Sequence, residues 1–252
     1  MININCDLGE GLNNEHILMP LINSCNIACG GHAGDSQSMI ECVEISIRNN
    51  VNIGAHPSYP DKENFGRKKI DISRSELHDS ILNQIENLNS IASSYGIKLH
   101  HIKAHGALYN QMFKDKDLSN FYLDTLNNFK DKCYVYVPFN SEIEKSALRK
   151  GFKIMYEAFG DRRYNDDLSL VSRERKDALI NTPNLVIDQI TNIKDLKKIK
   201  SINGIYKSIK ADTICIHSDT DNSIEILRKI CLLYTSDAAD EGLGVDLGGR
   251  RI

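Results

Sequence analysis

Short apolar runs alternate along this chain with longer segments whose apolar residues recur every three or four positions. Short runs of this kind are typical of buried strands, and the longer spacing is typical of amphipathic helices. Seven strands are predicted: residues 2–6, a strand ending at 26, 51–55, 97–102, 133–137, 152–156 and 212–216. Strands that alternate with helices predict a parallel sheet with right-handed crossovers, either closed as a barrel or open and doubly wound.

Two of the predicted helices have a start signal. Ser38 with Glu41, and Ser73 with Glu76, have the spacing of a capping box, in which each side chain satisfies a free backbone N–H group. Further helices are predicted over 141–150, 186–196 and 223–231. The loop at 58–69 is longer than a connection requires, and it could cover a pocket.

Length and charge narrow the class of protein. The 252 residues fit one large domain, and 31 basic against 34 acidic residues give a net charge of −3 without a basic block. We therefore expect no nucleic-acid partner and no membrane partner. The chain has no apolar run of about 18 residues and no signal-peptide pattern, so a cytoplasmic protein is expected. Its seven scattered cysteines favour reduced thiols over a disulfide framework.

The end of the chain differs from the rest in pattern. The apolar helical spacing fades after Cys231 and glycine becomes frequent. We expect a single barrel domain over residues 1–231 and interpret 232–252 as a non-native tail that resembles translated adapter sequence.

Polar side chains follow nearly every predicted strand. The carboxyl ends of parallel strands share one mouth in a barrel, and barrel enzymes carry out their chemistry there. A converging set of histidines and carboxylates is hard to explain by core packing, because each buried polar group needs a partner. These strand-end residues are Asp7, Glu10, Asn26, His32, His56, Lys103, His105, Glu157, His217 and Asp219.

Two chemistries fit such a mouth. Histidines and a carboxylate, with His32, His56 and Asp7 as candidates, could bind a divalent metal that activates water for deacetylation or amide cleavage. Alternatively, carboxylates act as acid and base while lysine and arginine stabilise a phosphorylated substrate. No His-Glu-x-x-His pair and no phosphate-binding Gly-x4-Gly-Lys-Ser/Thr loop is present, so both chemistries stay open.

Seven motifs occur in an order that resembles the LamB/YcsF family. The match runs from Met1 to about Cys231, and the ordered set is more specific than any single motif. The motifs are Asp7-Leu8-Gly9-Glu10-Gly11, the segment from Asn26 to Asp35 with its Gly30-Gly31-His32 core, Gly54-Ala55-His56-Pro57, Phe65-Gly66-Arg67, the segment from His105 to Asn110, the segment from Glu157 to Tyr164, and Cys215-Ile216-His217.

The resemblance implies a fold and a reaction. The implied fold is an α/β, distorted (β/α)7 TIM-like barrel, similar to polysaccharide deacetylases. The implied activity is ATP-dependent hydrolytic opening of 5-oxoproline to L-glutamate together with two partner subunits, B and C, which could themselves bind the ATP. A divalent metal stays open. The alternatives are a metal-dependent carbohydrate or amide deacetylase and a non-catalytic scaffold, and the dense set of strand-end polar residues disfavours the scaffold.

Site residues follow from the resemblance and the strand-end pattern together. A carboxylate, Asp7 or Glu10, is expected to act as base, and Lys103, His105 and Arg162 are expected to stabilise developing charge. The expected catalytic residues are Asp7, Glu10, His32, Lys103 and His105. The expected substrate contacts are Asn26, His56, Arg67, Tyr109, Glu157, Asp161, Arg162, Arg173 and His217.

Overall fold

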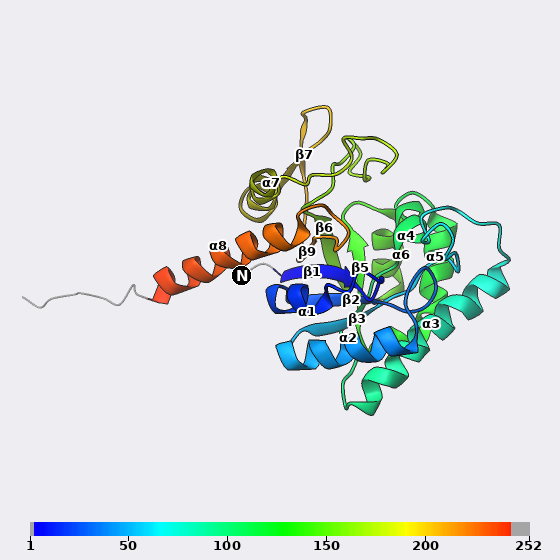
Figure 1. Ribbon diagram of the computed structural model, residues 1–252. Helices are drawn as coiled ribbons and strands as arrows, with labels where there is room; N and C mark the ends of the chain where they lie inside the picture. Colours follow the sequence, from blue (N-terminus) through cyan, green and yellow to red (C-terminus); the bar gives the residue numbers. More distant parts are fainter. Residues whose placement is uncertain (1–2, 243–252) are drawn as a thin grey trace, which may run out of the picture.

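Seven parallel strands close into a barrel in the computed structural model, which describes residues 3–242 and the side chains of 3–233 (Figure 1). Around the barrel each strand pairs with the next in the chain, and the last pairs with both β6 and β1. The predicted closed (β/α)7 barrel is therefore confirmed. The strands are β1 (Asn3–Leu8), β2 (Ser24–Ala28), β3 (Asn52–His56), β4 (His101–Ile102), β5 (Tyr134–Pro138), β6 (Ile154–Phe159) and β9 (Thr213–Cys215).

Helices surround the barrel and fill most of the connections between strands (Figure 1). An antiparallel hairpin of β7 (Lys198–Lys200) and β8 (Tyr206–Ser208) stands apart from the barrel sheet. The helices are α1 (Glu15–Leu18), η1 (Met19–Leu21), α2 (Ser36–Asn49), α3 (Arg74–Ser94), α4 (Gly106–Met112), α5 (Lys116–Thr125), η2 (Asn127–Phe129), α6 (Glu142–Lys150), α7 (Pro183–Leu196) and α8 (Ser223–Gly242).

The two predicted capping boxes have different outcomes. Ser73 caps α3 and exchanges hydrogen bonds with Glu76, as predicted. The prediction for α2 is wrong, because Asp35 is the cap and its carboxylate accepts the Ser38 backbone N–H at 2.9 Å. Asp35 is extended and its short carboxylate reaches the first turn, so the helix begins before Ser38.

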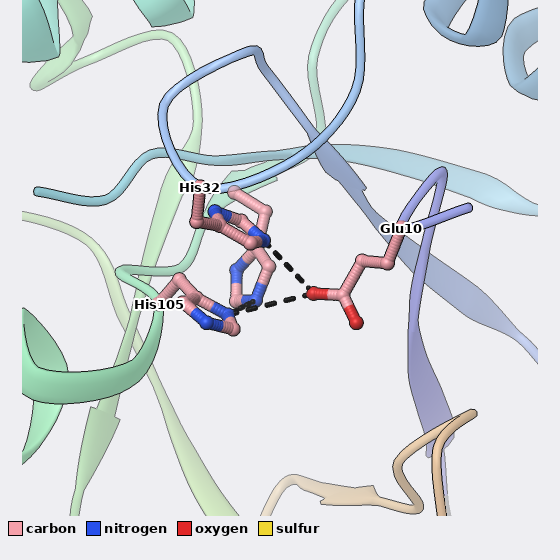
Figure 2. Close-up of side chains that lie close together, drawn as sticks. Glu10, His32 and His105 are labelled. Carbon is pink, nitrogen blue, oxygen red and sulfur yellow. Dashed lines mark hydrogen bonds and ion pairs between the residues drawn. The ribbon is translucent and has the colours of Figure 1, made fainter. Parts of the chain in front are cut away.

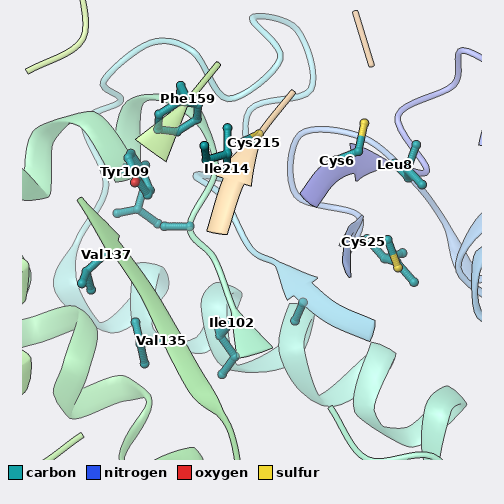
Figure 3. Packing of buried hydrophobic residues seen from close by; sticks show 14 of the residues in the cluster. Cys6, Leu8, Cys25, Ile102, Tyr109, Val135, Val137, Phe159, Ile214 and Cys215 are labelled. Carbon is teal, nitrogen blue, oxygen red and sulfur yellow. The ribbon is translucent and has the colours of Figure 1, made fainter. Parts of the chain in front are cut away.

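Alternation along the strands separates the core from the site. Cys6 and Leu8 of β1 and Cys25 and Ile27 of β2 are buried in the apolar cluster, part of which Figure 3 shows. The residues between them, such as Asp7, carry polar side chains toward the barrel interior, because successive strand residues point to opposite faces. All seven cysteines are free thiols, as expected.

The last helix is longer than predicted. α8 continues to Gly242, so the predicted non-native segment 232–252 begins inside a helix, and residues 243–252 lie outside the described part of the chain. Among residues 3–242 no helix has the length and apolar content needed to span a membrane.

Candidate active site

Lys103 stands at the centre of the barrel mouth and contacts side chains from three other strands. Its Nζ lies 2.8 Å from Asp7 Oδ1, 2.9 Å from Glu157 Oε1 and 3.1 Å from Cys215 Sγ. Burial alone would lower the pKa of Lys103, but Asp7, Cys215 and Glu157 raise it well above its usual value. Lys103 is therefore a buried, charged ammonium held between two carboxylates.

Asn26 also belongs to this group, through the hydrogen bonds of its side-chain amide. Its Nδ2 donates to Asp7 Oδ1 at 2.7 Å and to Asn5 Oδ1 at 2.8 Å, and its Oδ1 accepts from His101 Nε2 at 2.6 Å. Burial would raise the pKa of Asp7, but His56 and Lys103 lower it well below its usual value, so Asp7 is ionised. We call Asp7, Asn26, Lys103 and Glu157 the lysine cluster.

A second group lies beside it on the loops that follow β1, β2 and β4 and at the end of β3. His32 Nε2 donates to Glu10 Oε1 at 2.9 Å, and His105 Nδ1 lies 3.5 Å from the same oxygen (Figure 2). The His32 and His105 rings stack with centroids 3.6 Å apart. His56 Nε2 lies 3.0 Å from His105 Nδ1 and 3.4 Å from Asp7 Oδ2. We call Glu10, His32, His56 and His105 the histidine cluster.

The loop between β3 and α3 packs against this cluster. Its Phe65 ring contacts the rings of His32 and His105, with centroids 5.1 Å and 5.4 Å away. Gly66 has a φ of +60°, and an added Cβ would lie 2.9 Å from His32 Cβ, so glycine permits this close approach. The next residue, Arg67, lines the cavity at the mouth.

His217 follows β9 and is oriented by Asp161. Both its backbone N–H, at 2.8 Å, and its Nδ1, at 3.0 Å, donate to the Asp161 carboxylate, which also accepts the Thr220 hydroxyl. Burial would raise the pKa of Asp161, but His217 and Thr220 lower it, so it is a carboxylate. Because Asp161 holds the Nδ1 side of the ring, the other ring nitrogen of His217, Nε2, is the one that lies 4.0 Å from Asp7 Oδ2.

A cavity of about 660 Å³ opens above both clusters. Asp7, Lys103 and His217 are among the residues that line it, and three arginines lie around them. Arg67 and Arg173 both contact the Asp219 carboxylate, with Arg173 Nη1 at 2.9 Å from Oδ2. Burial and the neighbouring Arg173 lower the pKa of Arg162 to about 10, so it stays cationic at neutral pH. The wall of the cavity therefore suits an anion.

A smaller adjoining cavity of about 70 Å³ contains unsatisfied polar atoms. It is lined by Tyr109, Glu157 and Phe159 among others. The Tyr109 hydroxyl and both Glu157 carboxylate oxygens are buried without a well-aligned hydrogen bond to any described residue, although Lys103 forms an ion pair with Glu157. Because buried polar groups are usually satisfied, these atoms are available to a bound polar molecule.

The predicted site residues divide into two groups by position. Most line one of the two cavities: Asp7, His56, Arg67, Lys103, His105, Tyr109, Glu157, Arg162, Arg173 and His217. The others do not line either cavity and contact the lining residues from behind: Glu10, Asn26, His32 and Asp161. Asp161 therefore positions His217. Asn26 and Asp161 are both fully buried, and their expected substrate contacts stay a prediction.

Sequence reasoning missed three residues of the site. Asn5, His101 and Cys215 each lie two positions before a predicted site residue, and on an extended chain such residues share a face. Their contacts with Asn26 and Lys103 follow from that alternation. The i, i+2 spacing was the signal that could have identified them.

Comparisons with known proteins agree with this fold. A family model described as LamB/YcsF family matches residues 2–240. A relative from Staphylococcus saprophyticus, named as the A subunit of 5-oxoprolinase, is 37% identical over 98% of this chain and 99% of its own. A protein of the same name from Staphylococcus aureus strain Newman is 35% identical over 95% of this chain and 98% of its own.

Solved structures give the same picture. The crystal structure of a lactam utilization protein from Thermus thermophilus has a TM-score of 0.87 and 28% identity, covering 94% of this chain and 97% of its own. A putative cellobiose-phosphate cleavage protein from Enterococcus faecalis V583 has a TM-score of 0.57 and 11% identity, covering 95% and 93%, and shares the fold alone.

The molecule is thus a seven-stranded parallel barrel with a polar, cation-walled site at the carboxyl ends of its strands. The chain belongs to the LamB/YcsF family.

Proposed function

We propose that this chain is the A subunit of a 5-oxoprolinase, which opens 5-oxoproline to L-glutamate with hydrolysis of ATP and acts together with two partner subunits, B and C. The observation that carries the proposal is the 37% identity, over nearly the whole of both chains, to a relative of that name. The name lactam utilization protein of the Thermus thermophilus structure points to the same substrate class.

The chemistry of the substrate explains a role for ATP. The carbonyl carbon of an unstrained lactam is a poor electrophile. Transfer of a phosphoryl group from ATP to the lactam oxygen, with loss of the ring N–H proton, would make that carbon open to attack by water. Breaking of the C–N bond then opens the ring, and a second water releases phosphate. The cationic wall formed by Arg67, Arg162 and Arg173 suits both the phosphoryl group and the substrate carboxylate.

Lys103 has the position to stabilise charge in this reaction. Its ammonium is held by Asp7 and Glu157 at the cavity, and the residue is only 2% exposed. A preorganised cation in such a place stabilises negative charge that develops on the oxygen bound to the ring carbon more strongly than it would in water.

His217 is the side chain best suited to act as general base. Asp161 fixes its Nδ1–H, which leaves Nε2 as an acceptor at the cavity. Asp7 also lines the cavity, but its lowered pKa makes it a weak base, and Glu10 does not line it. We therefore assign proton abstraction from water to His217 and the anchoring of Lys103 to Asp7.

The experiment is to measure glutamate released from 5-oxoproline. The chain alone, the two partner subunits alone, and all three together are compared, each with and without ATP. Glutamate should form only in the full mixture with ATP. His217→Gln should abolish it while the protein stays folded. No glutamate in the full mixture, or equal release from the partner subunits alone, would contradict the proposal.

A second candidate is an ATP-independent, metal-dependent deacetylase. The observation in its favour is the histidine cluster, whose ligand atoms lie within 4.8 Å of one another. Release of acetate from acetylated sugars by this chain alone, without ATP, would support it. Dependence of all activity on ATP would exclude it.

A further inference from the structure

The hydrogen bonds of His56 and His105 leave two acceptors facing each other. His56 Nδ1 lies 2.8 Å from the Lys103 carbonyl oxygen, and His105 Nε2 lies 3.0 Å from the Phe65 carbonyl oxygen. A carbonyl oxygen only accepts, so these two nitrogens carry the ring protons. In neutral imidazoles the other nitrogens, His56 Nε2 and His105 Nδ1, then both hold lone pairs, and they are 3.0 Å apart.

Two carboxylates increase this excess of acceptors. Asp7 Oδ2 lies 3.4 Å from His56 Nε2, and Glu10 Oε1 lies 3.5 Å from His105 Nδ1. Both rings are buried, with His56 1% exposed and His105 6% exposed. Lone pairs and negative charges thus converge on the space between His56 Nε2 and His105 Nδ1, and the His32 N–H that reaches Glu10 Oε1 does not lie between these two nitrogens.

We propose that His56 Nε2, His105 Nδ1 and the Glu10 carboxylate bind one divalent transition-metal ion of the Zn²⁺ class. Ligands at about 2.05 Å in a tetrahedron lie about 3.3 Å apart, close to the 3.0 Å and 3.5 Å separations seen here. Two histidines and one glutamate leave a fourth position for water.

The surroundings of the three ligands match those of metal-bound histidines. A histidine that binds a metal almost always donates its other ring N–H to a carbonyl or carboxylate, as His56 and His105 both do. His32 belongs to this outer layer: its ring is parallel to that of His105, so the two lone pairs cannot meet at one ion, and His32 instead donates to Glu10.

The other group of candidate ligands at the mouth suits a metal less well. Asp7, Cys215 and His217 also offer ligand atoms within 4.8 Å of one another. The Lys103 ammonium, however, already lies 2.8 Å from Asp7 and 3.1 Å from Cys215, and it would repel a second cation. The metal is therefore placed in the histidine cluster.

Calorimetric titration of the chelator-treated protein tests the proposal, and because it measures binding it does not depend on the proposed reaction. Zn²⁺ and Mn²⁺ are titrated separately, and Co²⁺ serves as an absorbance probe of imidazole ligation. Wild type should bind one equivalent of Zn²⁺. His56→Ala and His105→Ala should lose this binding, and the near-isosteric Glu10→Gln should weaken it at least about tenfold.

His100→Ala is the matched control, because His100 forms a histidine pair with His101 but is not among the candidate metal ligands. It should bind like wild type. Circular dichroism in chelator establishes that each variant is folded. Absence of stoichiometric binding of all three metals by wild type would overturn the proposal and indicate a shared proton between His56 and His105. Binding that survives in folded His56→Ala and His105→Ala would overturn it as well.

Discussion

The lysine cluster and the histidine cluster lie side by side at the barrel mouth, and they differ in how donors and acceptors are matched. In the lysine cluster one ammonium meets two carboxylates, and both ends of the Asn26 amide are satisfied. In the histidine cluster the nitrogens of His56 and His105 meet each other and two carboxylates without a donor between them.

This difference separates two ways of building a polar site. A cluster whose charges are matched is held together before any ligand binds, because the Lys103 ammonium already meets both carboxylates, although the Glu157 oxygens accept no well-aligned hydrogen bond from a described residue. A cluster with an excess of acceptors is stable only when a cation or a proton completes it. The stability of the lysine cluster should therefore depend on its own side chains, and the stability of the histidine cluster should depend on the cation or proton that it binds.

The largest effect is expected from Lys103→Met. The substitution keeps most of the side-chain volume but leaves Asp7 and Glu157 buried without their cation, so the free energy of unfolding should fall by about 3–5 kcal/mol. Urea denaturation measures the change. The control is Lys114→Met, whose ion pair with Asp167 is exposed and should contribute little. Equal stability of Lys103→Met and wild type would show that the carboxylates are not charged in the folded protein.

Two substitutions of a carboxylate by its amide, one in each cluster, test the difference between the lysine cluster and the histidine cluster directly. In metal-free protein, Asp7→Asn should lower the free energy of unfolding by about 2 kcal/mol, because Lys103 loses a charged partner. Glu10→Gln should leave it unchanged, because the amide oxygen can still accept from His32 Nε2–H while the amide N–H donates toward the lone pair of His105 Nδ1. Urea denaturation in chelator measures both. Similar losses in the two variants would mean that the histidine cluster is not short of donors.

The sequence predicted where the site lies better than how its residues pair. Apolar runs that end in polar residues identified Asp7, His56 and Lys103 at the barrel mouth. Their pairing depends on barrel closure, which brings β9 beside β1 and places Cys215 against Lys103, 112 positions away. No local pattern contains that information.

Local elements were missed for simpler reasons. The strands β7 and β8 have three residues each and carry exposed lysine and tyrosine, so they produce no apolar run. The start of α2 was misplaced because Asp35 and Ser38 are both good caps, and the tertiary structure decides between them.

A substitution at the rim of the cavity should weaken substrate binding without changing the stability of the protein. Arg173→Ala removes a half-buried cation that lines the cavity, so KM for 5-oxoproline in the complete enzyme should rise roughly tenfold, the value of one charge-assisted hydrogen bond. Unfolding should change little. Arg175→Ala, on the same loop but paired with Asp177 in solvent, is the control and should leave KM unchanged. Equal effects of the two variants would remove Arg173 from substrate binding.

The effect expected to be smallest near neutral pH is a pH dependence of stability that arises from His101, beneath the lysine cluster. His101 is fully buried and donates from Nε2 to Asn26, and burial, followed by the neighbouring His100, lowers its pKa well below the usual value. The unfolded chain protonates this histidine near pH 6.5, whereas the folded chain does not. Its contribution to stability is therefore present above about pH 6.5 and is lost as the pH falls below that value, by up to about 1.4 kcal/mol per pH unit.

Comparison of wild type with His101→Gln by urea denaturation between pH 5 and 8 measures this contribution. Glutamine can still donate an N–H to Asn26 but does not titrate in this range. Plots of the free energy of unfolding against pH should be parallel above about pH 7.5 and converge below pH 6.5, where wild type loses the stability that neutral His101 contributes. Burial also lowers the pKa values of His32, His100 and His105, and because both proteins contain these histidines, both plots share the slope that they cause. Plots that stay parallel down to pH 5 would mean that His101 accepts a proton without leaving the folded state. The matched hydrogen bonds of Asn26 would then tolerate a positive charge beneath Lys103, and the description of the lysine cluster as held together before any ligand binds would be wrong.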